Sequence, residues 1–373
     1  MEVFTFTKDT VLSEVHLYFP HRKHFMVRLN AVGQPVFQST FKILCNSDTL
    51  EEFSQNEKEA ENKEDCACPE EDFQTNDVKC AIKLLDEDGD LEVLRKPQSV
   101  KQDYPRDIIC PTILTIANNE EIHSNENGNG NRVVRMEHTL ATPLGDVGKQ
   151  IWRGAFLLAD YILSNSEHFK GCTALELGAG TGFTSIILSM VANTIYCTDV
   201  GEDLLEMCMR NVTLNRNLPK KAGGEVKVKE MDWLKKAFSS DSESPYSWNE
   251  EDIANLHDHM TVIIAADVIY DDDLTDALFN TIYRIAHSAR NPCRIYLSTE
   301  RRYNFTLRQL DITCDAYNHF RSCLKELEDI IDGKIKFTAK EIKPSFPQFF
   351  SYERIEQLVS DGNFSSVYCN NIV

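Results

Sequence analysis

The stretch Ala174-Leu-Glu-Leu-Gly-Ala-Gly-Thr-Gly-Phe183 decides the fold of this 373-residue chain. It opens as a short apolar run, which predicts a buried strand, and it places three glycines where that strand should turn into a helix. Glycine permits a positive φ and a close approach of the backbone, while the N-terminus of the next helix offers free amides. Because ligands of open α/β sheets lie at the carboxyl ends of strands, we expect a binding site at this turn.

Strand and helix patterns alternate on both sides of this turn. A strand is predicted at 133–136 and a helix at 150–163. Further strands are predicted at 173–177, 194–198, 225–229, 261–266 and 294–298, with helices at 183–191, 202–214, 276–289 and 311–330, and two closing strands at 334–342 and 352–359. Such alternation predicts an α/β fold, with a mostly parallel sheet, helices on both faces and a C-terminal antiparallel hairpin.

The N-terminal part of the chain has a different character. Residues 3–44 alternate apolar and polar side chains around a turn at Gly33, which predicts two to four strands and a small accessory sheet. Residues 51–77 and 117–131 are acidic or rich in Asn and Gly, and they offer little apolar surface to bury. We therefore expect three regions: a β-rich extension at 1–45, a largely disordered acidic linker at 46–131, and the main domain at 132–373.

Composition narrows the class of partner. The formal net charge of -20 and a sequence pI of about 4.9 disfavour a nucleic-acid partner and favour a cationic one, such as a lysine-containing basic segment of a protein. No secretory signal or membrane-spanning run is visible, so we expect a protein of the nucleus or cytoplasm. We also expect a monomer. The twelve cysteines are expected to be mostly buried free thiols, and Cys66-Ala-Cys68 lacks the spacing of a metal site.

The spacing of the glycines discriminates between ligands. A dinucleotide fingerprint would read G-x-G-x-x-G, whereas here Gly182 is followed directly by Phe183. The observed G-x-G-x-G pattern, preceded by Glu176, resembles the first motif of the seven-strand methyltransferases that bind S-adenosylmethionine. Taken alone, a turn of glycines is also a common structural device.

Two further candidates follow the next two strands. Asp199 can accept hydrogen bonds from both ribose hydroxyls of an adenosine, although it could also cap the following helix if Asp203 does not. After the third strand of the sheet, Trp233 can stack on adenine and Asp232 can accept from its amino group. A lone tryptophan is more often a core residue, but this one lies at the edge of the sheet that carries the glycine turn.

The fourth candidate is Ala265-Ala-Asp-Val-Ile-Tyr270, after a very apolar strand. Asp267 and Tyr270 are expected near the point where a methyl group meets its acceptor. An Asn/Asp-Pro-Pro-Tyr sequence, typical of enzymes that methylate nucleobases or glutamine, is missing here. At least one of the three aspartates at 271–273 is expected to cap a helix, and His257 and His259 are expected in a loop or in the core.

Together with Trp152 and Glu300-Arg301, these sites resemble the seven-strand protein-lysine methyltransferases of the methyltransferase-like family, from about residue 132 to the C-terminus. Residues 9–18, 84–91 and 141–144 resemble one particular branch of that family. One departure is Arg153-Gly154, where relatives often have an acidic or small residue and then alanine. The resemblance implies a Rossmann-like fold, S-adenosyl-L-methionine as cofactor, catalytic roles for Asp267 and Tyr270, and cofactor contacts from Trp152, Glu176, Gly178, Ala179, Gly180, Gly182, Asp199, Asp232, Trp233 and Ala266.

The resemblance also implies the reaction, which is direct transfer of the methyl group to a neutral lysine amine of a protein substrate. Asp267 would orient the incoming ammonium, and Tyr270 would narrow the channel. Three other readings stay open: a small-molecule methyltransferase, a non-catalytic interaction module on the same fold, and a histidine acceptor.

Overall fold

The structure is a computed structural model that describes residues 10–13, 15, 25–30, 33–44, 133–220, 223–235, 238, 244–306, 311–359 and 362–371. The acidic tract at 51–77, the connector at 117–131 and Cys66-Ala-Cys68 lie outside these residues, so the predictions made for them stay predictions. Residues 1–45 and 124–373 belong to one compact unit. No helix within the described ranges is both long and apolar enough to cross a membrane.

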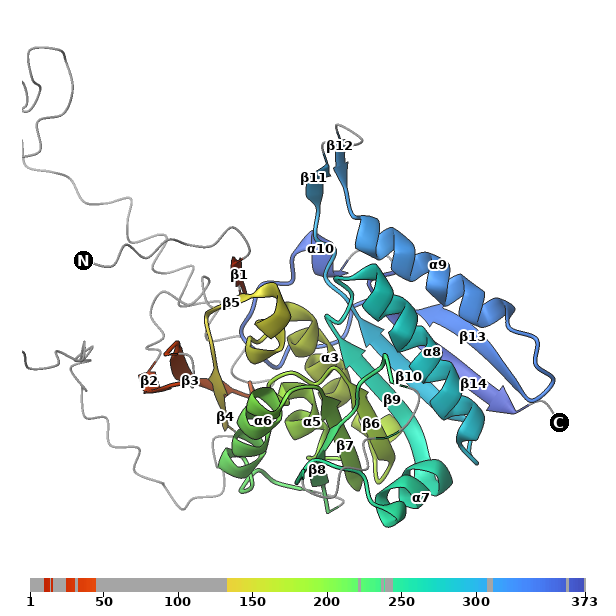
Figure 1. Ribbon diagram of the computed structural model, residues 1–373, viewed down its shortest axis with the longest axis horizontal. Coiled ribbons are helices and arrows are strands. Elements are labelled where there is room, and N and C mark those ends of the chain that lie inside the picture. Colours follow the sequence, from red (N-terminus) through yellow and green to blue (C-terminus); the bar gives the residue numbers. More distant parts are fainter. Residues whose placement is uncertain are drawn as a thin grey trace, which may run out of the picture. The chain divides into compact units, whose positions relative to one another are not determined.

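A seven-stranded sheet forms the centre of this unit, in the order β13-β14-β10-β9-β6-β7-β8 (Figure 1). Five neighbouring strands run parallel, and β14 runs antiparallel to both β10 and β13. The predicted α/β class, the mostly parallel sheet and the antiparallel C-terminal pair are therefore confirmed. The strands are β6 (Thr173–Leu177), β7 (Thr194–Asp199), β8 (Glu225–Glu230), β9 (Met260–Ala266), β10 (Cys293–Ser298), β13 (Ile335–Glu341) and β14 (Phe364–Asn371).

Helices cover both faces of the sheet, as predicted. One face packs against α3 (Arg153–Ser164), α5 (Phe183–Leu188) and α6 (Glu202–Leu214), and short α4 (Ser166–Phe169) follows α3. The other face packs against α7 (Glu250–His259), α8 (Asp272–Ser288) and α9 (Asp315–Asp329) (Figure 1). The chain changes direction across the sheet between β8 and β9, so the switch point where ligands bind in open sheets lies between β6 and β9.

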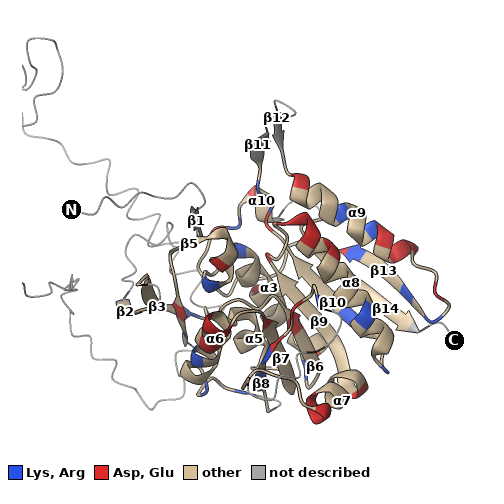
Figure 2. Ribbon diagram, viewed as in Figure 1, with Lys and Arg blue, Asp and Glu red and all other residues tan. Residues whose placement is uncertain are grey.

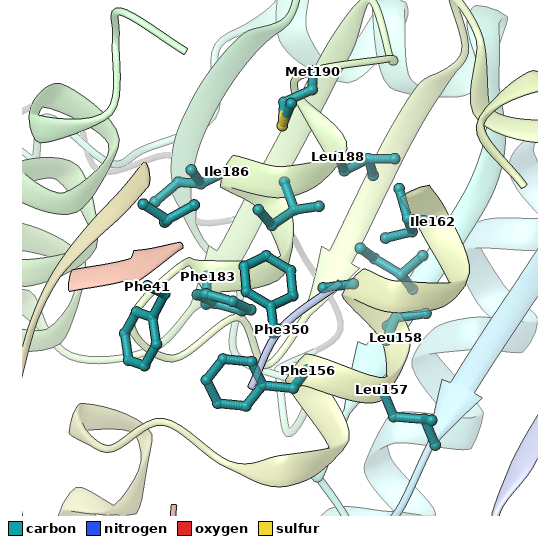
Figure 3. Packing of buried hydrophobic residues seen from close by; sticks show 14 of the residues in the cluster. Phe41, Phe156, Leu157, Leu158, Ile162, Phe183, Ile186, Leu188, Met190 and Phe350 are labelled. Carbon is teal, nitrogen blue, oxygen red and sulfur yellow. The ribbon is translucent and has the colours of Figure 1, made fainter. Parts of the chain in front are cut away.

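Aromatic rings fill the core beneath α3 and α5. Phe156 of α3 lies 4.7 Å from Phe183 of α5 between ring centroids, and Phe350 lies 5.2 Å from Phe183 (Figure 3). Phe41, from the N-terminal extension, approaches Phe156 and Phe183 at 5.2 and 5.7 Å. The extension therefore contributes directly to the core of the main sheet.

The extension is built from short strands that pair with the main domain. Strands β2 (Phe25–Leu29) and β3 (Pro35–Lys42) form a hairpin around Gly33, whose φ is +80°, and β3 pairs antiparallel with β4 (Val133–His138). Strand β1 (Thr10–Leu12) pairs with β5 (Ala141–Pro143). The three strands that the structure describes before residue 45 agree with the prediction of two to four.

Several predicted elements were wrong. The predicted strand at 352–359 is a loop followed by the short helix α10 (Glu356–Val359), because its apolar residues Tyr352 and Leu358 pack under α3 instead of entering the sheet. Residues 311–313 form β12 (Asp311–Thr313), paired with β11 (Asn304–Thr306), so α9 begins only at Asp315. Helix α8 begins at Asp272, four residues earlier than predicted, because Asp271 caps it by accepting from the N–H of Leu274.

Helix α7 was not predicted at all. His257 and His259 lie in its last turn, so the prediction that they lie in a loop or in the core was wrong. Among the described cysteines, Cys197 and Cys208 are buried free thiols, which confirms the prediction for them, whereas Cys172 is a free thiol that is only partly buried.

Candidate active site

The glycine turn joins β6 to α5 at the switch point of the sheet. Gly178 and Gly180 have φ values of +68° and +54°, a region that favours glycine. A Cβ on Gly178 would lie 2.6 Å from Val268 and 3.2 Å from the ring of Trp233, and a Cβ on Gly180 would lie 2.7 Å from the carbonyl oxygen of Gly148. Both positions therefore require glycine for backbone conformation and for space.

A cavity of about 1000 Å³, counting its open mouth, lies at this turn. Gly182 does not line it, because this glycine faces the sulfur of Cys208. All other residues predicted for the site line the cavity: Trp152, Glu176, Gly178, Ala179, Gly180, Asp199, Asp232, Trp233, Ala266, Asp267 and Tyr270.

Two carboxylates are fixed beside the turn. Asp199, at the end of β7, accepts from the backbone N–H of Gly180 at 2.7 Å and of Val200 at 2.8 Å. Burial raises the pKa of Asp199, and these two amides oppose that shift. Each oxygen keeps a lone pair for a further donor. Asp199 is thus held by the glycine turn itself and does not cap α6, whose N-cap is Gly201 without any side-chain hydrogen bond.

Glu176 lies deeper, near the end of β6, with 2% of its surface exposed. It accepts a short hydrogen bond from the hydroxyl of Ser185 in α5. Burial raises the pKa of Glu176 to about 7, although hydrogen bonds from Ser185 and Thr184 oppose the shift. The side chain therefore changes its charge near neutral pH and links the floor of the cavity to α5.

Trp233 lies in the wall of the cavity beside the glycine turn. Its ring lies against Gly178, and none of the described residues accepts a hydrogen bond from its buried Nε1–H. The neighbouring Asp232 accepts from the N–H of Leu234 at 3.0 Å and pairs with Lys235 at 3.3 Å. One wall of the cavity thus offers a flat aromatic face with a buried donor that the described part of the protein leaves available.

Asp267 follows β9 in a left-handed conformation, with φ of +52°. Its Oδ2 accepts from the N–H of Gly154 at 2.6 Å, and its Oδ1 accepts from the N–H of Glu300 at 2.7 Å. The carboxylate therefore ties the ends of β9 and β10 to the first turn of α3. A Cβ on Gly154 would lie 2.6 Å from this carboxylate, so the position leaves room only for glycine.

A buried ion pair lies beside Asp267. Arg153, with 2% exposed, pairs with Glu300 at 2.8 Å. Burial and the charge of Asp267 raise the pKa of Glu300, whereas Arg302 and Arg153 oppose the shift. The arginine thus compensates a second carboxylate behind the mouth of the cavity.

Aromatic side chains frame the mouth. Tyr270 is 38% exposed, and burial of its hydroxyl raises its pKa. Trp152 is the N-cap residue of α3 and donates from Nε1 to the carbonyl of Val147 at 3.0 Å. The guanidinium of Arg302 lies 4.3 Å from the centre of the Trp152 ring and covers one face of it.

Sequence reasoning missed the wall that precedes α3. The 3-10 helix η3 (Leu144–Lys149) brings Val147 and Gly148 into the cavity, and Leu204 of α6 packs behind Gly148. The only signal in the sequence is the pair of glycines at 145 and 148, which has no helical or strand period. Val268 and Thr184 also line the cavity without having been predicted.

The residues of the cavity fit a nucleoside cofactor with a charged tail. The glycine turn allows backbone contact, the unpartnered Nε1–H of Trp233 offers a donor beside a stacking surface, and Asp199 has lone pairs for hydroxyl groups. These groups converge from β6, β7 and the segment after β8 on one edge of the sheet.

Comparisons with known proteins support this assignment. The sequence profile of the family described as lysine methyltransferase matches residues 135–312. Methyltransferase-like protein 22 of Homo sapiens is 48% identical over 96% of this chain and 95% of that protein, and its Mus musculus counterpart is 48% identical over 96% of each. Protein N-lysine methyltransferase METTL21A of Mus musculus is 31% identical over 42% of this chain and 62% of that protein.

Fold, cavity and sequence profile agree on one class, the S-adenosylmethionine-dependent methyltransferases. Within this class the chain belongs to the family of methyltransferase-like protein 22, which is the branch that residues 9–18, 84–91 and 141–144 resemble.

Proposed function

We propose that this protein transfers a methyl group from S-adenosylmethionine to a lysine side chain of a protein substrate. The observation that carries the proposal is the single cavity in which the glycine turn and Trp233 face a mouth framed by Asp267 and Tyr270. The lysine methyltransferase profile over residues 135–312 and the similarity to METTL21A, a protein N-lysine methyltransferase, support a lysine acceptor.

The chain's own residues divide the work of holding the cofactor. Gly178 and Gly180 offer close backbone contact, and Glu176 helps to hold the methionine portion. Asp199 accepts from the ribose hydroxyls, and Trp233 packs on the adenine. The lining is completed by Trp152, Ala179, Asp232 and Ala266. Gly182 contributes indirectly, because it is the N-cap residue of α5. When bound, the cofactor supplies a methyl group that its sulfonium already activates.

The mouth positions the acceptor. A lysine amine has an ordinary pKa of about 10.4 and must lose a proton before it can attack. Asp267 keeps lone pairs on both carboxylate oxygens, so it can accept from the incoming lysine ammonium and orient it. The ammonium then loses its proton to water. Tyr270 keeps its hydroxyl proton, because burial raises its pKa, and it narrows the channel around the lysine stem.

The charge of the protein favours a basic substrate segment. The chain carries a net charge of -20, and acidic residues occupy the first turns of α6, α7 and α8 (Figure 2). Such a surface attracts a lysine-containing segment and repels a phosphate backbone. The monomeric state and the nuclear or cytoplasmic location stay predictions.

The test is incubation of a cell extract with methyl-labelled cofactor and either the wild-type protein or Glu176→Ala. We expect labelled protein bands with the wild type only, with methyl-lysine identified by mass spectrometry. Circular dichroism of Glu176→Ala checks that it folds, and Gly178→Ala provides a second cofactor-site variant. Label in metabolites, label on histidine, or a folded wild type without cofactor binding in calorimetry would each overturn the proposal.

A further inference from the structure

A cluster of three different ligand types lies between α8 and α9, outside the cavity described above. Asp276 of α8 meets His319 and Cys323 of α9, and one ligand atom of each lies within 4.8 Å of the others. His319 Nε2 is 2.8 Å from Asp276 Oδ1, Cys323 Sγ is 3.3 Å from the same oxygen, and Cys323 Sγ is 3.5 Å from His319 Nε2. Three donors thus converge on one point.

Helix geometry and packing fix this convergence. His319 and Cys323 are four residues apart, so they lie on the same face of α9. Below them, Phe279 of α8 packs against Phe320 of α9 with ring centroids 5.8 Å apart, which holds the two helices in register. The ligand atoms are therefore positioned by the core and not by mobile side chains alone.

The contacts do not suit a nucleophilic triad. In such a triad the two nitrogens of histidine contact different partners, so that the ring relays a proton between them. Here both the thiol and the carboxylate approach the same atom, Nε2 of His319. The arrangement suits three ligands around a common centre instead.

We propose that Asp276, His319 and Cys323 form a Zn²⁺ site, with water as the fourth ligand. Zinc is bound tetrahedrally at about 2.3 Å from sulfur and about 2.0–2.1 Å from nitrogen or oxygen. Those bonds set ligand separations of about 3.5 Å from sulfur to nitrogen or oxygen and about 3.3 Å from nitrogen to oxygen. The sulfur–nitrogen separation of 3.5 Å already matches, and the sulfur–oxygen separation of 3.3 Å is about 0.2 Å short. The hydrogen-bonded nitrogen–oxygen pair at 2.8 Å must open by about half an ångström.

The surroundings permit entry of an ion. The side chains of Asp276 and His319 are 56% and 31% exposed, whereas Cys323 is 6% exposed. A surface groove lined by Asp276, Cys323 and Glu326 leads to the cluster. On binding, the thiol proton leaves to solvent and the sulfur bonds to zinc, while His319 offers a neutral nitrogen.

Such a site would clamp α8 to α9. Helix α8 starts immediately after Tyr270, and its residue Leu274 lines the catalytic cavity. Asp276 stands two residues beyond Leu274, so a bound ion would restrain the first turns of the helix that borders the mouth.

The test titrates the full-length, metal-free protein with Co²⁺, whose bond to a thiolate gives a charge-transfer absorption band. We expect a band that saturates at one ion per chain and disappears when Zn²⁺ is added. Cys323→Ser should abolish this band. His319→Ala should weaken the affinity for Co²⁺ by about 10- to 100-fold or more, because the loss of a residue that merely hydrogen-bonds to a metal ligand typically has an effect of that size. Cys314→Ser, at the N-cap of the same helix, should behave as the wild type.

Absence of the band in the wild type would overturn the proposal, as would a band that survives Cys323→Ser or an affinity that His319→Ala leaves unchanged. If Cys323→Ser does not fold, the wild type and His319→Ala still decide. Binding of Zn²⁺ should also raise the melting temperature of the wild type but not of His319→Ala. None of these measurements depends on methyl transfer.

Discussion

Gly154 and Asp267 lie so close that the backbone N–H of one donates to the carboxylate of the other at 2.6 Å, with no room for a Cβ between them. The contact joins residues 113 positions apart, at the first turn of α3 and just beyond β9. It holds Asp267 in its left-handed conformation, which costs a non-glycine residue about 1 kcal/mol or more. The backbone at the mouth of the cavity is therefore held in a strained conformation.

Substitution of Asp267 separates alignment of the acceptor from cofactor binding. In Asp267→Ala the carboxylate is lost, while the glycine turn, Asp199 and Trp233 are retained. We expect kcat to fall about 100-fold or more, in line with a 1 Å misplacement of reacting groups, and cofactor affinity to fall much less. Steady-state kinetics and calorimetry measure the two quantities, and equal losses of both would count against the assigned role.

Gly154→Ala tests the close contact from its other side. The added Cβ would lie 2.6 Å from the carboxylate of Asp267 and displace it. We expect a decrease of about 1–3 kcal/mol in the free energy of unfolding, together with lower turnover. The control for stability is Gly145→Ala, whose Cβ would meet nothing within 4 Å. Denaturant titration of both variants checks this, and equal stability of the two would show that the contact is unimportant.

The indole N–H of Trp233 should serve the cofactor and not the fold. Trp233→Phe keeps an aromatic face but removes a donor that no described residue uses, so we expect cofactor affinity to fall about 2- to 10-fold. The matched control is Trp248→Phe, because Trp248 donates to the carbonyl of Glu230 at 2.8 Å. That control should lose about 1–3 kcal/mol of unfolding free energy and leave affinity unchanged. Calorimetry and thermal melts that show the reverse would refute the assignment.

Burial of Glu176 makes stability depend on pH. Its pKa in the folded protein is about 7, above the ordinary 4.5, so the folded state binds this proton more tightly than the unfolded state. The free energy of unfolding should therefore decrease as pH rises from about 4.5 to about 7 and level off above that, by an amount on the order of 3 kcal/mol. Glu176→Gln removes the titrating proton, so the difference between wild type and variant isolates the effect. A difference that does not change with pH would contradict a buried titrating carboxyl.

Much of the central fold could be predicted because local pattern and global position agree there. Strand β6 and helix α6 have the predicted bounds, since a short, mostly apolar run marks the strand and a clear amphipathic period marks the helix. Helix α7 escaped prediction because only Asp252 and Leu256 are buried along its ten residues, which leaves a polar pattern typical of a loop.

The last strand shows the opposite failure. Apolar spacing around Tyr352 favoured a strand, but these side chains pack into the core from an irregular segment. The true strand β14 contains Ser365, Ser366 and Asn370, and its position beside β10 and β13 gives it a backbone ladder that needs no alternating apolar signature.

Within the site, prediction succeeded where chemistry follows a strand end. Asp199 ends β7 and Asp267 directly follows β9, and these two parallel strands flank β6, so the topology alone places both residues at one edge of the sheet. Prediction failed for Gly148, which reaches the cavity from a 3-10 helix, and for the pairing of Gly154 with Asp267. Both depend on contacts between distant segments that no local pattern encodes.

The ladder between β3 and β4 has a practical implication for anyone who prepares shortened forms of this enzyme. A recombinant fragment starting at residue 132 would leave β4 without β3, the strand it pairs with, and would uncover part of the buried surface of Val134 and Met136. The side chain of Gln150, which also borders the cavity, would lose its hydrogen bonds to the backbone of Ser13 and Val11. Such a fragment should aggregate and bind its cofactor poorly, although it would retain every residue of the glycine turn.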